Sequence, residues 1–152
     1  MKIGGVQVTS CEELLVLPRP NGEDIPIRAK AVSVNDEFDK ICPEPTPPNV
    51  RTKEGSKPDF TDKHYRQAQV IRGEQRFAFM VLKSIESSDI DWDGAVDLEK
   101  PTTWLKWRGE LMKAGISEVE CNRIVNLVMS ANSLDEAKIE AARQGFLRGQ
   151  GA

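Results

Sequence analysis

The stretch TDKHYRQAQVIRGEQRFAFMVLKSI, residues 61–85, carries its apolar residues at the spacing of an α-helix. One face of that helix is formed by Val70, Phe77, Val81 and Ile85, with Ala78 and Met80 beside it. Residues three and four apart lie on the same side of a helix, so the pattern predicts one helix over 62–85. Phe79 projects the opposite way, which leaves FAFMVL apolar nearly all round. This segment is therefore either buried on two sides or offers a second face to a partner.

Three shorter helices are predicted in the last third of the chain. The first is PTTWLKWRGELMKAG, residues 101–115, with Pro101 at the first helical position and Gly115 at the exit. Proline suits that position because the first turn of a helix does not use its N–H groups, and glycine suits the residue after the last turn. The apolar stripe of this helix is Trp104, Trp107, Leu111 and Ala114.

Two capping boxes predict where the last two helices begin. Ser117 with Glu120 opens one helix, and Ser133 with Glu136 opens the other. In this motif each side chain accepts a hydrogen bond from the backbone N–H of the other residue. The stripes predicted to face inward are Cys121, Ile124, Leu127, Val128 and Ala131 in the first helix, and Ile139, Ala142 and Phe146 in the second.

The first forty residues predict β-structure followed by a short helix. LLVL, residues 14–17, is a compact apolar run, and IPIRAKA, residues 25–31, alternates as a half-buried strand does. The turn residues of PRPNGED lie between them, so a β-hairpin is expected. KIGGVQV, residues 2–8, predicts a further edge strand weakened by its glycines. NDEFDKI, residues 35–41, predicts a short helix with Asn35 as its N-cap.

A proline-rich segment follows the β-structure. CPEPTPPNVRTKEGSKPDF, residues 42–60, contains five prolines and almost no apolar residues. Proline fixes φ and removes a backbone donor, so the segment predicts an extended linker without a helix or a central strand. The sequence therefore predicts an α+β protein with a small β-rich unit and a short helix over 1–42. It also predicts a linker over residues 43–60 and a domain of about four helices over residues 61–149.

The overall composition restricts the classes of function. The net charge of −3 gives no basic excess for binding nucleic acid. In a helix-turn-helix the second helix, here residues 118–132, would contact the DNA bases, but Arg123 is its only basic residue. No apolar run approaches the roughly 20 residues of a membrane span, and the N-terminus shows no apolar signal segment. Three scattered cysteines, Cys11, Cys42 and Cys121, are expected to stay reduced in a cytosol.

The acidic stretch DIDWDGAVDLEK, residues 89–100, has most of the pattern of a calcium-binding EF-hand loop. The twelfth position, which needs a bidentate carboxylate, is Lys100, and Pro101 limits how the chain can adjust. The aspartates are better explained as caps near helix starts. His64 is the only histidine and has no partner in a catalytic or metal-binding motif. We therefore expect no metal, no cofactor and no enzymatic activity.

A set of motifs runs through the second half of the chain: RFAFMVLKSI, Trp92 in the acidic loop, PTTWLKW, the spacing of ELMKAG, ANSLDE and a final Phe-Leu pair. In these motifs the chain resembles the tail assembly chaperones of long-tailed bacteriophages. The resemblance covers 61–149 well, and CEELLVLPR with IPIRAKAV resembles the front of the same family less distinctively.

The resemblance implies a non-catalytic assembly factor of the host bacterial cytoplasm. Such a protein binds the tape-measure protein, keeps it soluble and helps to recruit tail-tube subunits. Trp104, Trp107, Leu111 and Phe79 are the candidate protein-binding residues, because aromatic side chains offer a large contact area. The alternative for the two tryptophans is a place in the core of the helical domain. Self-association through an exposed edge strand is also expected.

A structural virion protein of the tail or neck is the alternative function. A protein with that role is expected to have more β-structure and a larger apolar surface for self-association than this sequence predicts.

Overall fold

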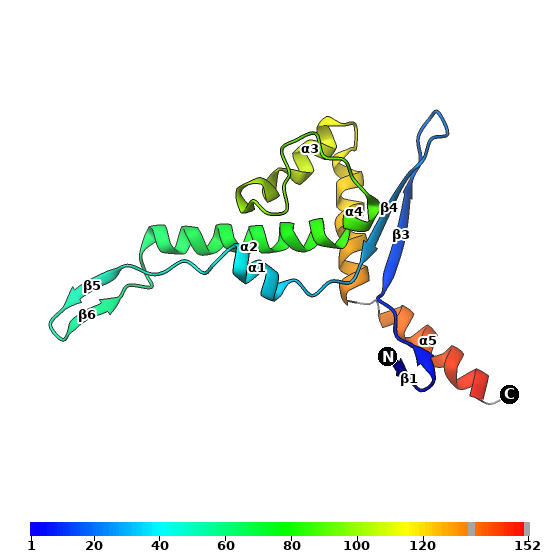
Figure 1. The fold of residues 1–152 in the computed structure, drawn as a ribbon, viewed down its shortest axis with the longest axis horizontal. Helices are drawn as coiled ribbons and strands as arrows, with labels where there is room; N and C mark the ends of the chain where they lie inside the picture. Colours follow the sequence, from blue (N-terminus) through cyan, green and yellow to red (C-terminus); the bar gives the residue numbers. More distant parts are fainter. Residues whose placement is uncertain (134–135, 151–152) are drawn as a thin grey trace. The chain divides into compact units, whose positions relative to one another are not determined.

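The computed structural model describes residues 1–133 and 136–150 and has a mixed α+β fold (Figure 1). Its strands form short antiparallel pairs in the first half of the chain, and most of its helices lie in the second half. The predicted fold class is therefore confirmed at this level, whereas the proline-rich linker is not shown.

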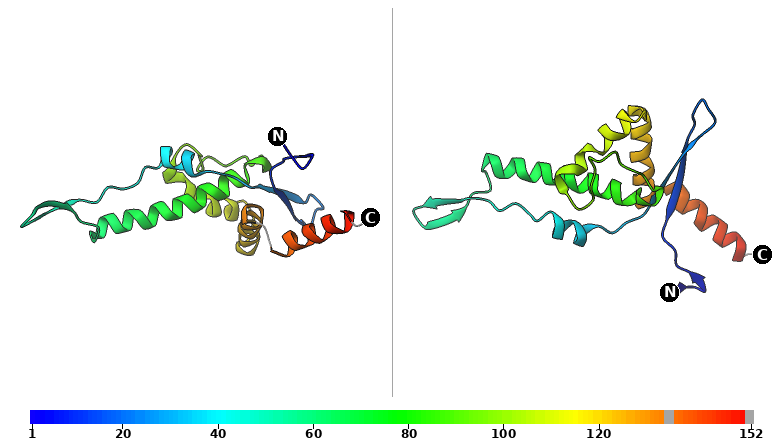
Figure 2. Two further views of the ribbon diagram at one scale, coloured as in Figure 1. Left: turned by 90° about the horizontal axis from the view of Figure 1, so that it is seen from below. Right: turned by 45° about the horizontal axis from the view of Figure 1, so that its top comes forward.

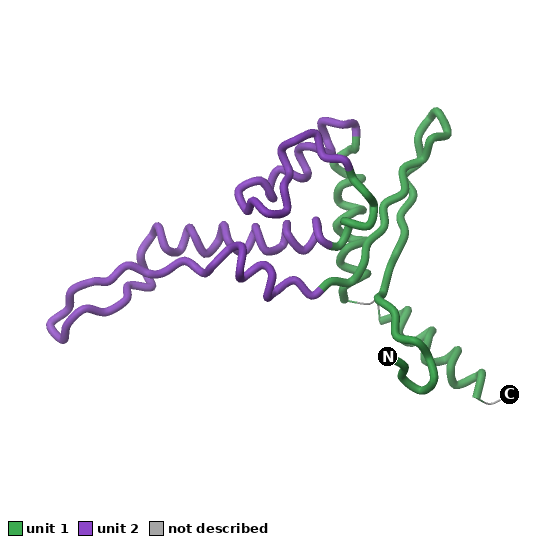
Figure 3. Tube along the Cα trace, in the orientation of Figure 1, with its two compact units in different colours: residues 1–32, 84–90, 116–152 green, residues 33–83, 91–115 purple. Residues whose placement is uncertain are grey.

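The chain forms two compact units, each built from separate segments (Figure 3). Unit 1 contains residues 1–32, 84–90 and 116–152, and unit 2 contains residues 33–83 and 91–115. The domain boundaries expected from the sequence, at residues 42 and 61, stay a prediction.

A β-hairpin is the centre of unit 1, as the sequence predicts. Strand β3, Glu12–Leu17, pairs antiparallel with β4, Ile25–Lys30, in a register that sets Leu14 opposite Arg28. Ile27 and Ala29 are buried while their neighbours along the strand are exposed, which is the expected alternation. The turn between the strands is closed by Asp24, whose carboxylate accepts a hydrogen bond from the Arg19 backbone at 2.9 Å.

Helix α4, Glu118–Ser133, packs on one face of this hairpin. Its buried residues are Cys121, Ile124, Val128 and Ala131, as predicted, whereas Leu127 is half-buried. The first capping box is confirmed. The Ser117 N–H donates to the Glu120 carboxylate at 3.0 Å, and the Glu120 N–H donates to the Ser117 hydroxyl at 3.1 Å. The second predicted box includes residues 134 and 135, which lie outside the described residues.

Helix α5, Glu136–Gln150, ends the described part of unit 1 and corrects one expectation. Ile139, Ala142 and Phe146 were predicted to face inward, but every described residue of α5 is exposed. The apolar stripe exists, and nothing within the described residues covers it.

Unit 2 is built on the long helix α2, Lys63–Ser84, which is one residue shorter at each end than the predicted 62–85. The last residue of α2, Ser84, is part of unit 1. The predicted buried face is wrong in its first half, because Val70 is 60% exposed and Phe77 is 41% exposed. The buried side chains are Ala78, Phe79, Val81 and Leu82. The face shifts because the aromatic rings of two neighbouring segments pack against Phe79.

Those neighbouring segments are helix α1, Asn35–Ile41, and the 3₁₀ helix η2, Pro101–Lys106, which continues as α3, Trp107–Lys113. Pro101 opens η2 at its first position as predicted, although the first turns are 3₁₀ rather than α. Gly115 follows α3 with φ of +111°, a conformation that suits glycine at a helix exit. Ala114, predicted to face inward, is exposed.

The N-cap prediction for α1 was wrong. The cap is Val34, and Asn35 is the first helical residue. The Asn35 side chain instead accepts a hydrogen bond from Arg76 at 3.1 Å.

Two short hairpins replace features that the sequence predicted differently. The expected edge strand at the N-terminus folds back on itself as β1, Lys2–Ile3, and β2, Val6–Gln7, because both intervening glycines adopt positive φ. Within the proline-rich segment, β5, Asn49–Thr52, pairs with β6, Gly55–Pro58, and Figure 2 shows this hairpin from two further sides. Proline stands at the end of β6, where a strand tolerates it.

Candidate functional site

Three aromatic rings form the centre of unit 2. The Phe79 and Trp104 ring centroids lie 4.6 Å apart, and Phe38 lies 6.0 Å from Phe79 and 5.9 Å from Trp104. All three side chains are fully buried. Separations of this size are typical of favourable aromatic contacts, so this cluster is a major part of the unit's core.

All four candidate protein-binding residues lie in this core. Phe79 and Trp104 are 0% exposed, Trp107 is 4% and Leu111 is 8% exposed. The structure brings Phe79 and Trp104 into contact, while Trp107 and Leu111 are buried along α3. The alternative reading of the two tryptophans as core residues is thus what the structure shows. A binding role for any of the four stays a prediction and would require the core to open.

The acidic loop before η2 is held by hydrogen bonds within unit 2. The indole N–H of Trp104 donates to the carbonyl oxygens of Asp97 at 3.1 Å and Leu98 at 3.2 Å. The Asp97 carboxylate accepts from the Glu99 N–H at 2.9 Å, which closes a turn within the loop. The predicted capping of the following helix by an aspartate is wrong, because the cap of η2 is Lys100 and no side chain bonds to its first turn. Lys100, at the position where calcium needs a carboxylate, forms an ion pair with Asp97 at 3.7 Å.

Trp92, in the same loop, is half-buried. In the described part of the chain, no group of three His, Cys, Asp or Glu side chains is arranged to hold a metal ion.

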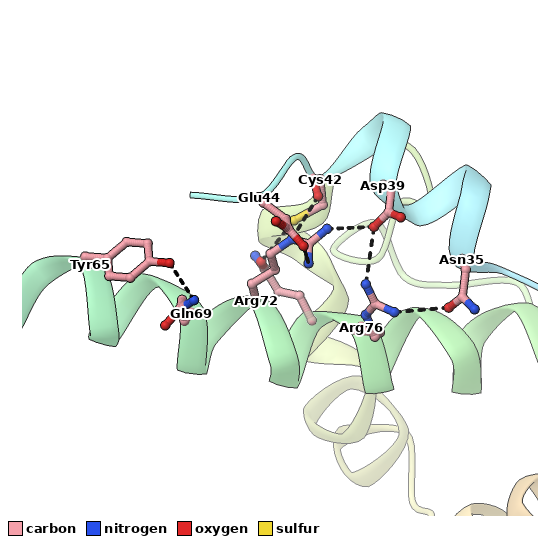
Figure 4. A network of polar contacts seen from close by, with 9 residues as sticks. Asn35, Asp39, Cys42, Glu44, Tyr65, Gln69, Arg72 and Arg76 are labelled. Atoms are coloured by element: carbon pink, nitrogen blue, oxygen red, sulfur yellow. Dashed lines mark hydrogen bonds and ion pairs between the residues drawn. The ribbon is translucent and has the colours of Figure 1, made fainter. Parts of the chain in front are cut away.

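A pair of arginines joins α1 to α2 and was not found from the sequence (Figure 4). Arg72 donates to the Asp39 carboxylate at 2.7 Å and to the Cys42 carbonyl at 3.1 Å. Arg76 reaches the same carboxylate at 3.2 Å. Both guanidinium carbons lie 4.8 Å from the centroid of the Phe38 ring, within the range of cation–π attraction.

The spacing on the two helices could have revealed this network. Arg72 and Arg76 are four residues apart on α2, and Asn35 and Asp39 are four residues apart on α1. Each pair therefore lies on one helix face, and the faces meet. A hollow of about 270 Å³ lies beside the network, lined by Glu44, Pro45, Gln69, Arg72, Gly73 and Arg76. Because carboxylates already neutralise the arginines, this network fastens helices together rather than forming an anion-binding site.

A second ion pair lies in unit 1 at the end of β3. Arg19 and Glu120 approach to 2.7 Å, and both side chains are about four-fifths buried, with 22% and 21% of their surface exposed. The hydrogen bond from Arg19, followed by that from the Ser117 N–H, holds the pKa of Glu120 below its ordinary value. Glu120 thus serves both the helix cap and the contact between the hairpin turn and α4.

An exposed apolar stripe runs along α5. Ile139 is 43% exposed, Phe146 is 65% exposed and Leu147 is 47% exposed. Ile139 and Phe146 lie seven residues apart, two helical turns, with Ala142 between them on the same face. An ion pair between Lys138 and Glu13 joins α5 to β3. The helix therefore presents an amphipathic face that its own unit does not bury.

No protein-family model, curated protein or solved structure matches the chain. Within the described residues, no helix is long and apolar enough to span a bilayer.

Proposed function

We propose that this chain is a tail assembly chaperone of a long-tailed bacteriophage. In this role it binds the tape-measure protein in the host bacterial cytoplasm, keeps it soluble and helps to recruit tail-tube subunits around it. The mechanism is binding and release, without catalysis or a cofactor. The observation that carries the proposal is the exposed apolar stripe of α5, formed by Ile139, Ala142 and Phe146.

An amphipathic helix is a suitable device for holding a long helical client. Helical partners are commonly bound through apolar anchors at a spacing of three, four and seven residues, which is the spacing on α5. Burial of a large apolar side chain is worth about 1.5–3 kcal/mol when complete. The exposed parts of Ile139 and Phe146 can therefore contribute about 2 kcal/mol together.

Charges flank the stripe and can give the contact its orientation. The first half of α5 contains Glu136, Glu140 and Lys138, of which Lys138 pairs with Glu13, and the second half contains Arg143 and Arg148. A client helix with the opposite order of charges would be favoured over one with the same order. A reversible contact of this strength fits an assembly factor that must release its client when tail-tube subunits arrive.

The test is co-expression with the tape-measure protein. The proposal expects a larger soluble fraction of that protein in the presence of the chain. The double variant Ile139→Gln with Phe146→Gln is expected to reduce affinity for the client roughly 10- to 100-fold. Ala141→Gln with Gly145→Gln is the matched control, since it adds the same side chains to α5 away from the stripe.

The outcomes separate the protein's role from the surface that performs it. Unchanged solubility of the tape-measure protein would refute the chaperone role. An equal loss of affinity for the client in both double variants would show that the stripe on α5 is not the client-binding surface. Mass spectrometry of purified phage particles should find none of this chain, whereas many copies per particle would favour a structural component of the tail or neck.

A further inference from the structure

The N-terminal hairpin β1–β2 has one face that is entirely apolar. Ile3 lies opposite Val6 in its register. The pairing extends to Met1 and Val8, because the Val8 N–H donates to the Met1 carbonyl at 3.1 Å. Residues opposite each other on paired strands share a face, and neighbours along a strand alternate between the two faces. The apolar face is therefore formed by Met1, Ile3, Val6 and Val8, and the polar face by Lys2 and Gln7.

Nothing within the described residues buries this apolar face. Its four side chains are between 44% and 83% exposed, Val8 the least and Met1 the most. A two-stranded hairpin alone is at best marginally stable in water, so an amphipathic one is expected to pack its apolar side on another element. The adjoining Thr9 and Ser10 form no hydrogen bond within the described residues, so the hairpin can turn about them.

The apolar stripe of α5 lies within reach of this hairpin. An ion pair between Glu13 and Lys138 holds α5 beside the start of β3. Val8 comes five residues before Glu13, and five residues span at most about 17 Å. Ile139 follows Lys138 directly, and Phe146 lies about 12 Å beyond Lys138 along the helix. The hairpin can therefore reach the whole stripe while the ion pair stays formed.

The two faces also match in size and in kind. Ile139 and Phe146 are separated by about 10 Å along α5, and Met1 and Ile3 by about 7 Å along the hairpin, before their side chains are added. Strands packed on a helix form a common two-layer arrangement. The short connection keeps hairpin and helix at an effective concentration on the order of millimolar, which favours the hairpin over a separate molecule as the cover of the stripe.

We propose that the N-terminal hairpin closes over α5 as an intramolecular lid, with its apolar face packed on Ile139 and Phe146. The structure shows the open arrangement, in which both faces are exposed. Closure occupies the surface assigned above to the client, so lid and client compete for α5. The competition rests on the proposed function, whereas the contact between hairpin and helix does not.

Hydrogen exchange of the full chain, followed by mass spectrometry, tests this contact without a client. An isolated helix of 15 residues is marginal in water, so a lid that packs on α5 should slow the exchange of its amides. Ile3→Gln with Val6→Gln makes the centre of the apolar face polar and should speed that exchange about threefold or more. Lys2→Gln with Gln7→Asn, on the opposite face of the same hairpin, is the matched control and should leave it unchanged.

Protein concentration separates a lid from a contact between molecules. Because the lid belongs to the same chain, exchange in α5 should be the same at low and at high concentration. Circular dichroism should show the same helix content and the same melting temperature for both double variants, since the hairpin lies outside the core.

The competition has its own readout in the affinity for the tape-measure protein. The apparent dissociation constant includes the fraction of chains in which α5 is open, so Ile3→Gln with Val6→Gln should lower it about threefold or more. A tape-measure protein that does not bind the unmodified chain would refute the proposed function, and hydrogen exchange would still decide whether the lid exists.

Two results would overturn the lid. One is exchange in α5 that the apolar-face and polar-face variants change equally, or that neither changes. The other is protection of α5 that increases with protein concentration, which would assign the cover to a second copy. An unchanged or weaker affinity for the tape-measure protein in the apolar-face variant would overturn the competition.

Discussion

Replacement of Trp104 tests whether the aromatic cluster of unit 2 stabilises the fold. The side chain is fully buried, its ring lies 4.6 Å from that of Phe79, and its indole N–H bonds two loop carbonyls. Truncation of a buried tryptophan to alanine costs about 3–5 kcal/mol, because apolar contacts are lost and a cavity remains. We expect Trp104→Ala to lower the free energy of unfolding by about 4 kcal/mol, a large part of the roughly 5–15 kcal/mol that stabilises a typical domain.

Urea unfolding followed by far-ultraviolet circular dichroism measures this change. At a slope of about 2 kcal/mol per molar urea, the midpoint should fall by roughly 2 M. Trp104→Phe keeps most of the ring but loses the indole N–H, so it should cost about 1–2 kcal/mol. Leu105→Ala is the control, since Leu105 is 46% exposed and should change stability by less than about 0.5 kcal/mol. If Trp104→Ala unfolds at the same urea concentration as the unmodified chain, the side chain is not in the core and the reasoning fails.

The two ion pairs give further predictions. Asp39→Ala removes the carboxylate that Arg72 contacts at 2.7 Å and should lower the free energy of unfolding by about 1–2 kcal/mol in urea titrations. Glu44→Ala should change it by less than about 0.5 kcal/mol, because Glu44 is 83% exposed and 3.8 Å from Arg72, and equal losses in both variants would contradict this assignment. Folding lowers the pKa of Glu120 below 4.5, so its contribution to stability is present above that pH and is lost as the pH falls below it. Glu120→Gln should accordingly show a smaller fall in melting temperature between about pH 7 and about pH 3 than the unmodified chain, and parallel curves would show that the Arg19 contact is not formed in solution.

Local signals in the sequence were enough to predict the main elements. The β3–β4 hairpin follows from alternation and turn residues, and the start of α4 follows from the Ser117 capping box. These features are decided by neighbours in the chain, so a single sequence contains the information. The β5–β6 hairpin was missed because the prolines of residues 42–60 suggested a linker. Four of the five prolines precede β5, however, and Pro58 is the last residue of β6, where a strand tolerates it.

Which apolar face is covered could not be predicted, because that depends on segments far away in the chain. Val70 and Phe79 are both apolar residues of one helix, yet Phe79 is buried by rings from α1 and η2 while Val70 is exposed. The stripe on α5 was recognised, but a pattern cannot tell whether its cover lies in the same molecule or in another. The same limit applies to the candidate site. The sequence could not show that Phe146 is exposed whereas the two candidate tryptophans are buried.

The segmented construction of unit 1 has a consequence for the newly synthesised chain. The Val32 N–H donates to the Asn132 side chain at 2.9 Å, and these residues are 100 positions apart in the sequence. At a synthesis rate of about 5–20 residues per second, the ribosome needs about 5–20 s to make the intervening chain. During that interval the buried face of β4, with Ile27 and Ala29, has no α4 to cover it, and an isolated two-stranded hairpin is barely stable in water. The first strands to leave the ribosome are therefore among the last to be secured, and translation speed sets how long they stay unprotected.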